Sequence, residues 1–175
     1  MDADDHAYDV FISYRQQDPD GAWVRGVLVE RLRAAGLRVF VDYESFRLGA
    51  PLVLEMARGV EQSRYTLAVL SPAYLESNFT ELENVLAEHL GLPAPVQSHH
   101  GDHHLTGEVA AELENVLAEH LGLESSQRRL LMVRRAPCEP RLGMRARLWL
   151  DMTSDEEVER NLPRLVAALR EPSSP

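Results

Sequence analysis

A twelve-residue stretch with carboxylates near its start occurs twice in this chain of 175 residues. ELENVLAEHLGL fills Glu81–Leu92 and recurs letter for letter at Glu112–Leu123. The leucines and valine keep helical spacing, so each copy predicts a helix with Glu83, or in the second copy Glu114, in its first turn. The amino end of a helix favours an anion, so these carboxylates are expected to be ionised. Such a glutamate can either stabilise positive charge developing on a substrate or cap its own helix.

The two copies differ in what surrounds them. The first follows SPAYLESNF directly, and Thr80-Glu81-Leu82-Glu83 also reads as a capping box, in which Thr80 and Glu83 satisfy backbone groups at the helix start. The second runs on into ESSQRRLLMV, as a short connection to a following strand would. We assign the first copy to the domain, which makes Glu83 the candidate. If the second copy forms the domain helix instead, Glu114 is the candidate in place of Glu83.

Short apolar, β-branched runs predict the strands that must position these groups. Those runs are Tyr8–Tyr14, Leu37–Asp42, Tyr65–Ser71, Arg128–Val133 and Arg147–Met152. Helical spacing predicts three helices between and after them. They cover residues 24–35 (ended by Gly36), residues 52–60, and a last helix from Asp155 that Pro163 should kink or interrupt. This alternation predicts a parallel sheet with helices on both faces.

Reactive groups in such a sheet collect beyond the carboxyl ends of the strands. Ser13, Tyr14 and Arg15 follow the first predicted strand, and the segment 42–45 follows the second. Two of these residues also have an ordinary structural interpretation: Arg15 could form a surface ion pair, and Asp42 could be a turn residue. No GxGxxG follows the first strand, and the chain has no lysine for a Walker-type phosphate loop or a receiver domain.

Composition narrows the class of protein. A formal charge of −10 and a pI near 5.1 argue against nucleic-acid and anionic-membrane partners. Cys138 is the single cysteine, and no apolar run approaches the roughly 20 residues of a membrane span, which predicts a cytoplasmic protein. We expect one domain over residues 1–170 with an inserted or duplicated segment at about 93–123, then a linker-like tail at 171–175. The histidines of the insert are expected to be solvated rather than to bind a metal.

Three blocks in this order resemble a Toll/interleukin receptor (TIR) domain: YDVFISYR, VFVDYESFRLGAPLVLEMARGVEQS and YTLAVLSPAYLESNFTELE. The resemblance covers about Tyr8 to Arg170 without the insert. It implies an α/β fold similar to flavodoxin, a three-layer sandwich around a central, mostly parallel five-stranded sheet.

The resemblance also implies a function. Many bacterial TIR domains are NAD+ hydrolases that cleave the nicotinamide–ribose bond, and they act in defence or stress signalling when copies self-assemble. Their catalytic glutamate ends a Trp-Cys-x-x-Glu pattern, which reads Phe79-Thr80-Glu81-Leu82-Glu83 here. Phe79 keeps an aromatic residue, and Thr80 departs from the pattern. NAD+ would be the substrate, with no cofactor and no metal.

The same resemblance distributes further roles over the chain. The implied substrate-binding residues are Ser13, Tyr14, Arg15, Asp42, Tyr43 and Ser45. The loop at Asp42–Pro51 matches the BB loop, through which TIR domains pack on one another. Its implied self-association residues are Glu44, Phe46, Arg47, Gly49 and Pro51. Two alternatives stay open, a non-catalytic module that signals by TIR–TIR association and a sensor of a nucleotide signal.

Overall fold

The computed structural model describes residues 6–76, 130–138 and 149–172. Both copies of ELENVLAEHLGL and the predicted insert lie outside the described residues. Glu83 and Glu114 therefore keep the status of sequence predictions, as does the assignment of the first copy to the domain helix.

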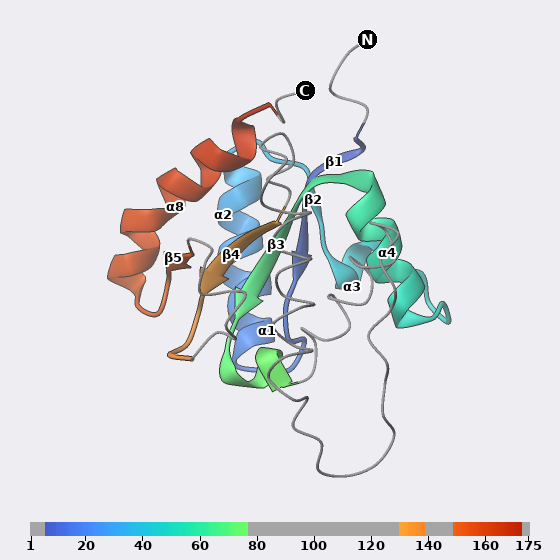
Figure 1. Cartoon of the computed structure of the whole chain (residues 1–175), viewed down its shortest axis with the longest axis horizontal. Coiled ribbons are helices and arrows are strands. Elements are labelled where there is room, and N and C mark those ends of the chain that lie inside the picture. Colours follow the sequence, from blue (N-terminus) through green and yellow to red (C-terminus); the bar gives the residue numbers. More distant parts are fainter. Residues whose placement is uncertain (1–5, 77–129, 139–148, 173–175) are drawn as a thin grey trace, which may run out of the picture.

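The sheet has five parallel strands in the order β2-β1-β3-β4-β5, as Figure 1 shows. The strands are β1 (Tyr8–Ser13), β2 (Val39–Phe40), β3 (Ser63–Leu70), β4 (Leu130–Arg134) and β5 (Leu150–Asp151). Each of the five predicted runs overlaps one of these strands, although β3 begins two residues before its run and β4 ends one residue after it. The predicted flavodoxin-like sheet is confirmed. β2 is shorter than predicted, because the chain turns into a helix at Asp42 directly after Val41.

Helices cover both faces of the sheet (Figure 1). On one side lie α1 (Asp20–Trp23), η1 (Val24–Leu28), α2 (Val29–Ala34) and α8 (Asp155–Arg170). On the other side lies α4 (Leu52–Gln62), preceded by the short α3 (Asp42–Ser45). The predicted helix over 24–35 is present and begins earlier, at Asp20, with a π-helical segment in its middle.

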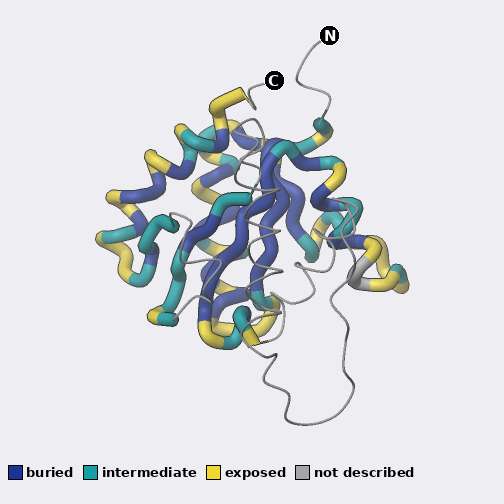
Figure 2. The backbone as a smooth tube through the Cα atoms, in the orientation of Figure 1, coloured by how far each residue is buried: buried dark blue, intermediate teal, exposed yellow. Residues whose placement is uncertain are grey.

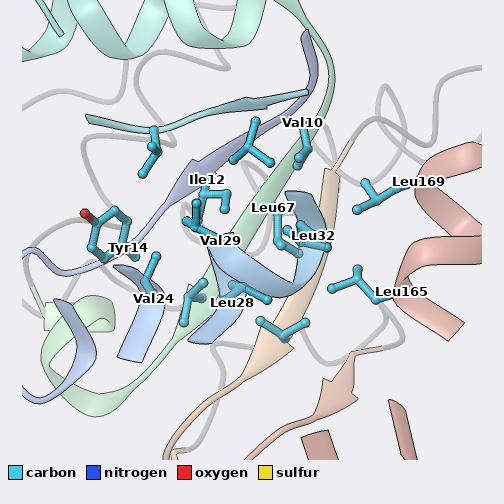
Figure 3. Packing of buried hydrophobic residues seen from close by; sticks show 14 of the residues in the cluster. Val10, Ile12, Tyr14, Val24, Leu28, Val29, Leu32, Leu67, Leu165 and Leu169 are labelled. Carbon is cyan, nitrogen blue, oxygen red and sulfur yellow. The ribbon is translucent and has the colours of Figure 1, made fainter. Parts of the chain in front are cut away.

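Alternation along β1 divides the buried residues into two clusters. Val10 and Ile12 point to the side of α2 and α8, where Figure 3 shows them packed with Leu28, Leu32 and Leu165. Phe11, between them in sequence, points to the opposite side and packs with residues of α4. Figure 2 shows the resulting pattern, with the central strands β1 and β3 buried, β5 at the edge half-buried, and the outer faces of the helices exposed. Both faces of the central strands are therefore mostly apolar, and polar groups gather mainly at the strand ends.

The helix ends follow the predicted signals, with one correction. Gly36 takes a left-handed backbone (φ +83°) just after α2, as predicted. Ser154 caps α8 by accepting a hydrogen bond from the Glu157 amide at 3.2 Å. Pro163 is predicted to kink or interrupt the last helix, and the interruption is wrong, because α8 runs unbroken to Arg170. Pro163 lies on the exposed side, where water can satisfy the backbone carbonyl that the proline ring leaves unpaired. Within the described ranges, no helix combines the length and apolarity needed to cross a membrane.

Candidate functional site at the carboxyl edge of the sheet

The carboxyl ends of the strands meet at one edge, where β1 lies between β2 and β3 and the strand order reverses. Two hydrogen-bonded groups join β1 and its loop to the segment after β3. The hydroxyls of Ser13 and Tyr74 are 2.9 Å apart, and both residues are buried. The Ser71 hydroxyl donates to the buried carboxylate of Asp20 and accepts from the Tyr74 amide at 3.2 Å. The start of the helix that begins at Pro72 is thereby fixed against β1 and α1.

Tyr14 and Asp42 connect the ends of β1 and β2. The Tyr14 hydroxyl donates to a carboxylate oxygen of Asp42, and the tyrosine is only 4% exposed. Burial raises the pKa of Tyr14, the hydrogen bond and charge of Asp42 raise it further, and Arg25 opposes the change. Tyr14 therefore remains a protonated donor that orients Asp42. Since the Tyr14 ring belongs to the core, Asp42, which is partly exposed, is the member of this pair nearer to solvent.

Arg15 lies between the β1 loop and the segment after β3. Its guanidinium donates to the Ala73 carbonyl at 3.4 Å and to the Gln17 side chain at 2.7 Å. Ser45 lies at the end of α3, and its hydroxyl accepts from the Val41 amide at 3.4 Å. Tyr43 also lies in α3, and its side chain is outside the described part of the structure. Positive charge and hydroxyl groups thus stand at the same edge as Asp42.

Two spaces of different size lie at this edge. A cavity of about 20 Å³, room for about one water molecule, is bordered by Ser13, Tyr14, Asp42 and Phe46 among others. An open groove of about 640 Å³ lies next to the ends of β3 and β4. The residues that line it are Pro72, Leu75, Glu76, Arg134, Pro137 and Cys138. Of these two spaces, both bordered by described residues, the groove is the one with the volume of a nucleotide-sized ligand site.

The segment 42–51 after β2 is anchored from beneath by one carboxylate. Glu55, in the first turn of α4, is 1% exposed. It accepts the Arg47 amide at 3.0 Å and the Arg47 Nε at 2.7 Å, and it also accepts from Arg58. Burial alone would raise the pKa of Glu55, but the hydrogen bonds from Arg58 and Arg47 lower it to about 2. Glu55 is therefore ionised at any physiological pH.

Further contacts hold the same segment at its sides. Glu44 forms an ion pair with Arg33, with Nη1 and Oε1 3.0 Å apart. Phe46 packs on Phe11 and Phe40, with ring centroids 6.4 and 6.1 Å away.

The outer half of the segment is exposed. Leu48 has its whole surface in solvent, and Gly49 takes a left-handed backbone (φ +81°) that favours glycine. Pro51, also exposed, directly precedes α4. The segment is a loop with a fixed base and an exposed apolar tip.

The model of the TIR domain family matches residues 10–166. This chain belongs to the TIR family. Over 76 residues, 43% of this chain, it is 34% identical to the 2′ cyclic ADP-D-ribose synthase BtTIR of Bacteroides thetaiotaomicron and 33% identical to the NAD(+) hydrolase TirS of Staphylococcus aureus. It is 29% identical over 82 residues, 47% of this chain, to Toll-like receptor 6 of Bos taurus.

These similarities are partial. The chain spans about a quarter of the length of each of the two bacterial proteins, 26% in both cases, and 10% of the receptor. Among solved structures, the TIR domain of the Toll-related receptor TRR-2 from Hydra magnipapillata superposes with a TM-score of 0.64 at 20% identity. That match covers 94% of this chain and 100% of the Hydra chain, and it shows the shared fold.

For the TIR domain, the structure brings together part of the predicted constellation. Ser13, Tyr14, Arg15, Asp42 and Ser45 do lie at one edge of the sheet. Ser13 and Tyr14 are buried and paired within the protein, so they form the floor of the edge. The contacts that these residues would make with a ligand stay a prediction.

Three groups at this edge were missed in the sequence. Tyr74 follows β3 and Arg134 is the last residue of β4. Their positions at strand ends could have marked both as site candidates, but nothing in the neighbouring sequence indicates which residues they contact. Leu48 in the BB loop is a single leucine without periodic neighbours, so its exposure could not be predicted.

The acid stability of the TIR domain is expected to depend on Glu55. The pKa of Glu55 is lowered from the ordinary value of 4.5 for a glutamate to about 2 in the folded protein, so folding favours the ionised carboxylate. That contribution is complete above pH 4.5 and is lost as the pH falls towards 2. The free energy of unfolding in urea should therefore be higher for wild type than for Glu55→Gln, and this difference should become smaller as the pH falls from about 6 to about 3. A difference that stays constant over this range would contradict the assignment, and Glu61→Gln, on the exposed side of α4, is the control.

Proposed function

We propose that this TIR domain cleaves NAD+ between nicotinamide and ribose when several copies assemble, in bacterial defence or stress signalling. The observation that carries the proposal is the similarity to TirS, named an NAD(+) hydrolase, and to BtTIR, named a 2′ cyclic ADP-D-ribose synthase, at 33% and 34% identity. The position of Glu83 in the Phe-Thr-x-x-Glu pattern and the polar groups at the carboxyl edge are consistent with it.

Cleavage of the nicotinamide–ribose bond requires few catalytic groups from the protein. Nicotinamide leaves as a neutral molecule and takes the electron pair of the broken C–N bond, so no general acid is required. Positive charge develops on the ribose, as in glycoside hydrolysis, and one ionised carboxylate beside the sugar stabilises it. A water molecule, or a hydroxyl of the same molecule, then attacks the ribose carbon and loses its proton. Hydrolysed and cyclised ADP-ribose are the two corresponding products.

We assign the roles by position at the edge. Glu83 is the carboxylate that stabilises the ribose. Arg15, the cation beside Ala73, is suited to the pyrophosphate, because a guanidinium offers several donors to phosphate oxygens. Asp42, oriented by Tyr14, is suited to accept from a ribose hydroxyl. The adjoining BB loop is the surface by which neighbouring copies complete the site.

The test is nicotinamide release from NAD+ by the full chain, in dilute solution and clustered on a multivalent scaffold. We expect release that rises steeply with clustering, followed by chromatography of nicotinamide and of the ADP-ribose product. No release at any density, with folding verified by circular dichroism, would contradict the proposal.

Two observations favour a second function, a non-catalytic association module. Similarity extends to Toll-like receptor 6, a receptor by name, and the BB loop presents the fully exposed Leu48. Self-association without any release of nicotinamide would decide for this module.

A further inference from the structure

Glu55 is a charged side chain in a place where an apolar one would serve packing better. It lies 1% exposed on α4, next to Met56, which packs in the core of that face. Burying a carboxylate is costly unless it is fully hydrogen-bonded, and an apolar replacement of equal volume often does as well. The reason for a carboxylate at this position should therefore be found in what it holds.

Both oxygens of Glu55 are occupied, and the donors come from the BB loop and from α4 itself. Oε1 accepts the Arg47 guanidinium, at 2.7 Å from Nε and 2.6 Å from Nη2. Oε2 accepts the Arg47 amide at 3.0 Å and also a guanidinium nitrogen of Arg58. Arg58 in turn donates to the backbone carbonyl of Ser45 and lies over the Phe40 ring, 5.1 Å from its centroid. One carboxylate thus fixes the loop backbone at residue 47 directly and at residue 45 through Arg58.

The tip of the loop depends on that anchor. The Ala50 amide donates to the Arg47 carbonyl at 3.1 Å, which closes a turn over Arg47–Ala50. Leu48, in this turn, has its whole surface exposed and adds no packing energy, and Gly49 takes a left-handed backbone. The orientation of the turn is therefore set mainly where Arg47 is attached, and Arg47 is attached to Glu55.

We propose that Glu55 is the positioning residue of the BB loop, and that it holds the tip with Leu48 in the orientation in which a second copy of the chain docks. The docking half of this inference rests on the proposed function, in both its catalytic and its non-catalytic form. The positioning half does not. Glu55 takes no part in the bond cleavage itself.

Glu55→Gln tests the proposal directly because both carboxylate oxygens of Glu55 accept hydrogen bonds from arginines. The variant keeps the volume and one acceptor, but whichever way the amide is turned, its NH2 group faces an arginine donor. We expect amide hydrogen exchange at Arg47 and Ala50 to become at least about tenfold faster, a larger factor than at the amides inside α4, which accelerate only as far as the loss of global stability requires. Glu61→Gln, on the exposed side of the same helix, should leave the exchange of the loop unchanged. Unchanged exchange in a folded Glu55→Gln variant would overturn the proposal.

Arg47→Met covers the case in which Glu55→Gln fails to fold. The Arg47 side chain is 65% exposed and Arg58 still neutralises Glu55, so the core is spared. Faster exchange at the amide of residue 47 and at Ala50 is expected again, and unchanged exchange would again overturn the proposal.

The docking half is measured separately, as self-association of the full chain by analytical ultracentrifugation. We expect association to weaken at least about fivefold in whichever of the two variants is folded, and wild-type association with a loosened loop would overturn this half. Because neither readout involves NAD+, a wild-type chain that releases no nicotinamide counts against the enzymatic proposal alone.

Discussion

Glu83→Gln is expected to lower nicotinamide release from the clustered TIR domain by about 10²- to 10³-fold, the effect of removing one electrostatic contact to a charged transition state. Glu114→Gln is expected to leave release close to the wild-type rate. The physical reason is the charge. Glutamine keeps the size and hydrogen-bonding capacity of glutamate but cannot stabilise the positive ribose. The measurement is the initial rate of nicotinamide release at saturating NAD+.

The duplicated stretch supplies an unusually well-matched control. From Glu81 and Glu112 onwards the two copies are identical over twelve residues, so the two substitutions have the same local sequence on the carboxyl side. Glutamine also serves in a capping box as glutamate does, so a loss of activity in Glu83→Gln would not be explained by a lost helix cap. Glu83→Gln therefore separates the catalytic role of Glu83 from its alternative role as a cap.

Each other outcome identifies a different error. Loss only in Glu114→Gln would place the second copy in the domain and contradict the choice of the first. Full activity in both variants would transfer the carboxylate role to another acidic group at the edge, of which Asp42 is the first to test.

The elements of this fold could be predicted because local sequence determines them. A strand buried on both faces needs a continuous apolar run, and a surface helix needs 3.6-residue spacing. Both patterns are plain in YDVFISY and in residues 24–35. Two of the departures arise where the tertiary environment overrides the local sequence. β2 is shortened because α3 begins at Asp42, and α8 tolerates Pro163 because that residue faces solvent.

The candidate site was predictable to the level of its edge, and no further. Parallel strands bring their carboxyl ends together, so Ser13, Tyr14, Arg15 and Asp42 could be placed near one another from the chain alone. Their partners could not. The bond from Ser13 to Tyr74 joins residues 61 apart. The role of Glu55 depends on how α4 packs beneath the BB loop, and the spacing of apolar residues in the sequence does not indicate that packing.

Gly21→Ala is expected to destabilise the TIR domain by about 1–3 kcal/mol, towards the upper end of the range for overpacking. A Cβ atom at Gly21 would lie 2.1 Å from the carbonyl oxygen of Gln16 and 2.9 Å from a guanidinium nitrogen of Arg25. The arginine can move aside, but the carbonyl belongs to the backbone of the loop after β1. The Gly21 amide also donates to the Gln17 carbonyl at 3.0 Å, which ties the two segments together. The free energy of unfolding in urea measures the effect.

Gly26→Ala is the matched control, five residues further along the same continuous helix. A Cβ there meets nothing within 4 Å, so the change should stabilise the protein by about 0.5–1 kcal/mol through helix propensity alone. Opposite signs at the two glycines would show that close approach, and not flexibility, requires Gly21. Equal stabilisation at both would mean that the loop after β1 shifts freely. In that case Arg15, which this loop carries into the candidate site, would not be held in place by the fold, and its proposed contact with a pyrophosphate would have to form by induced fit.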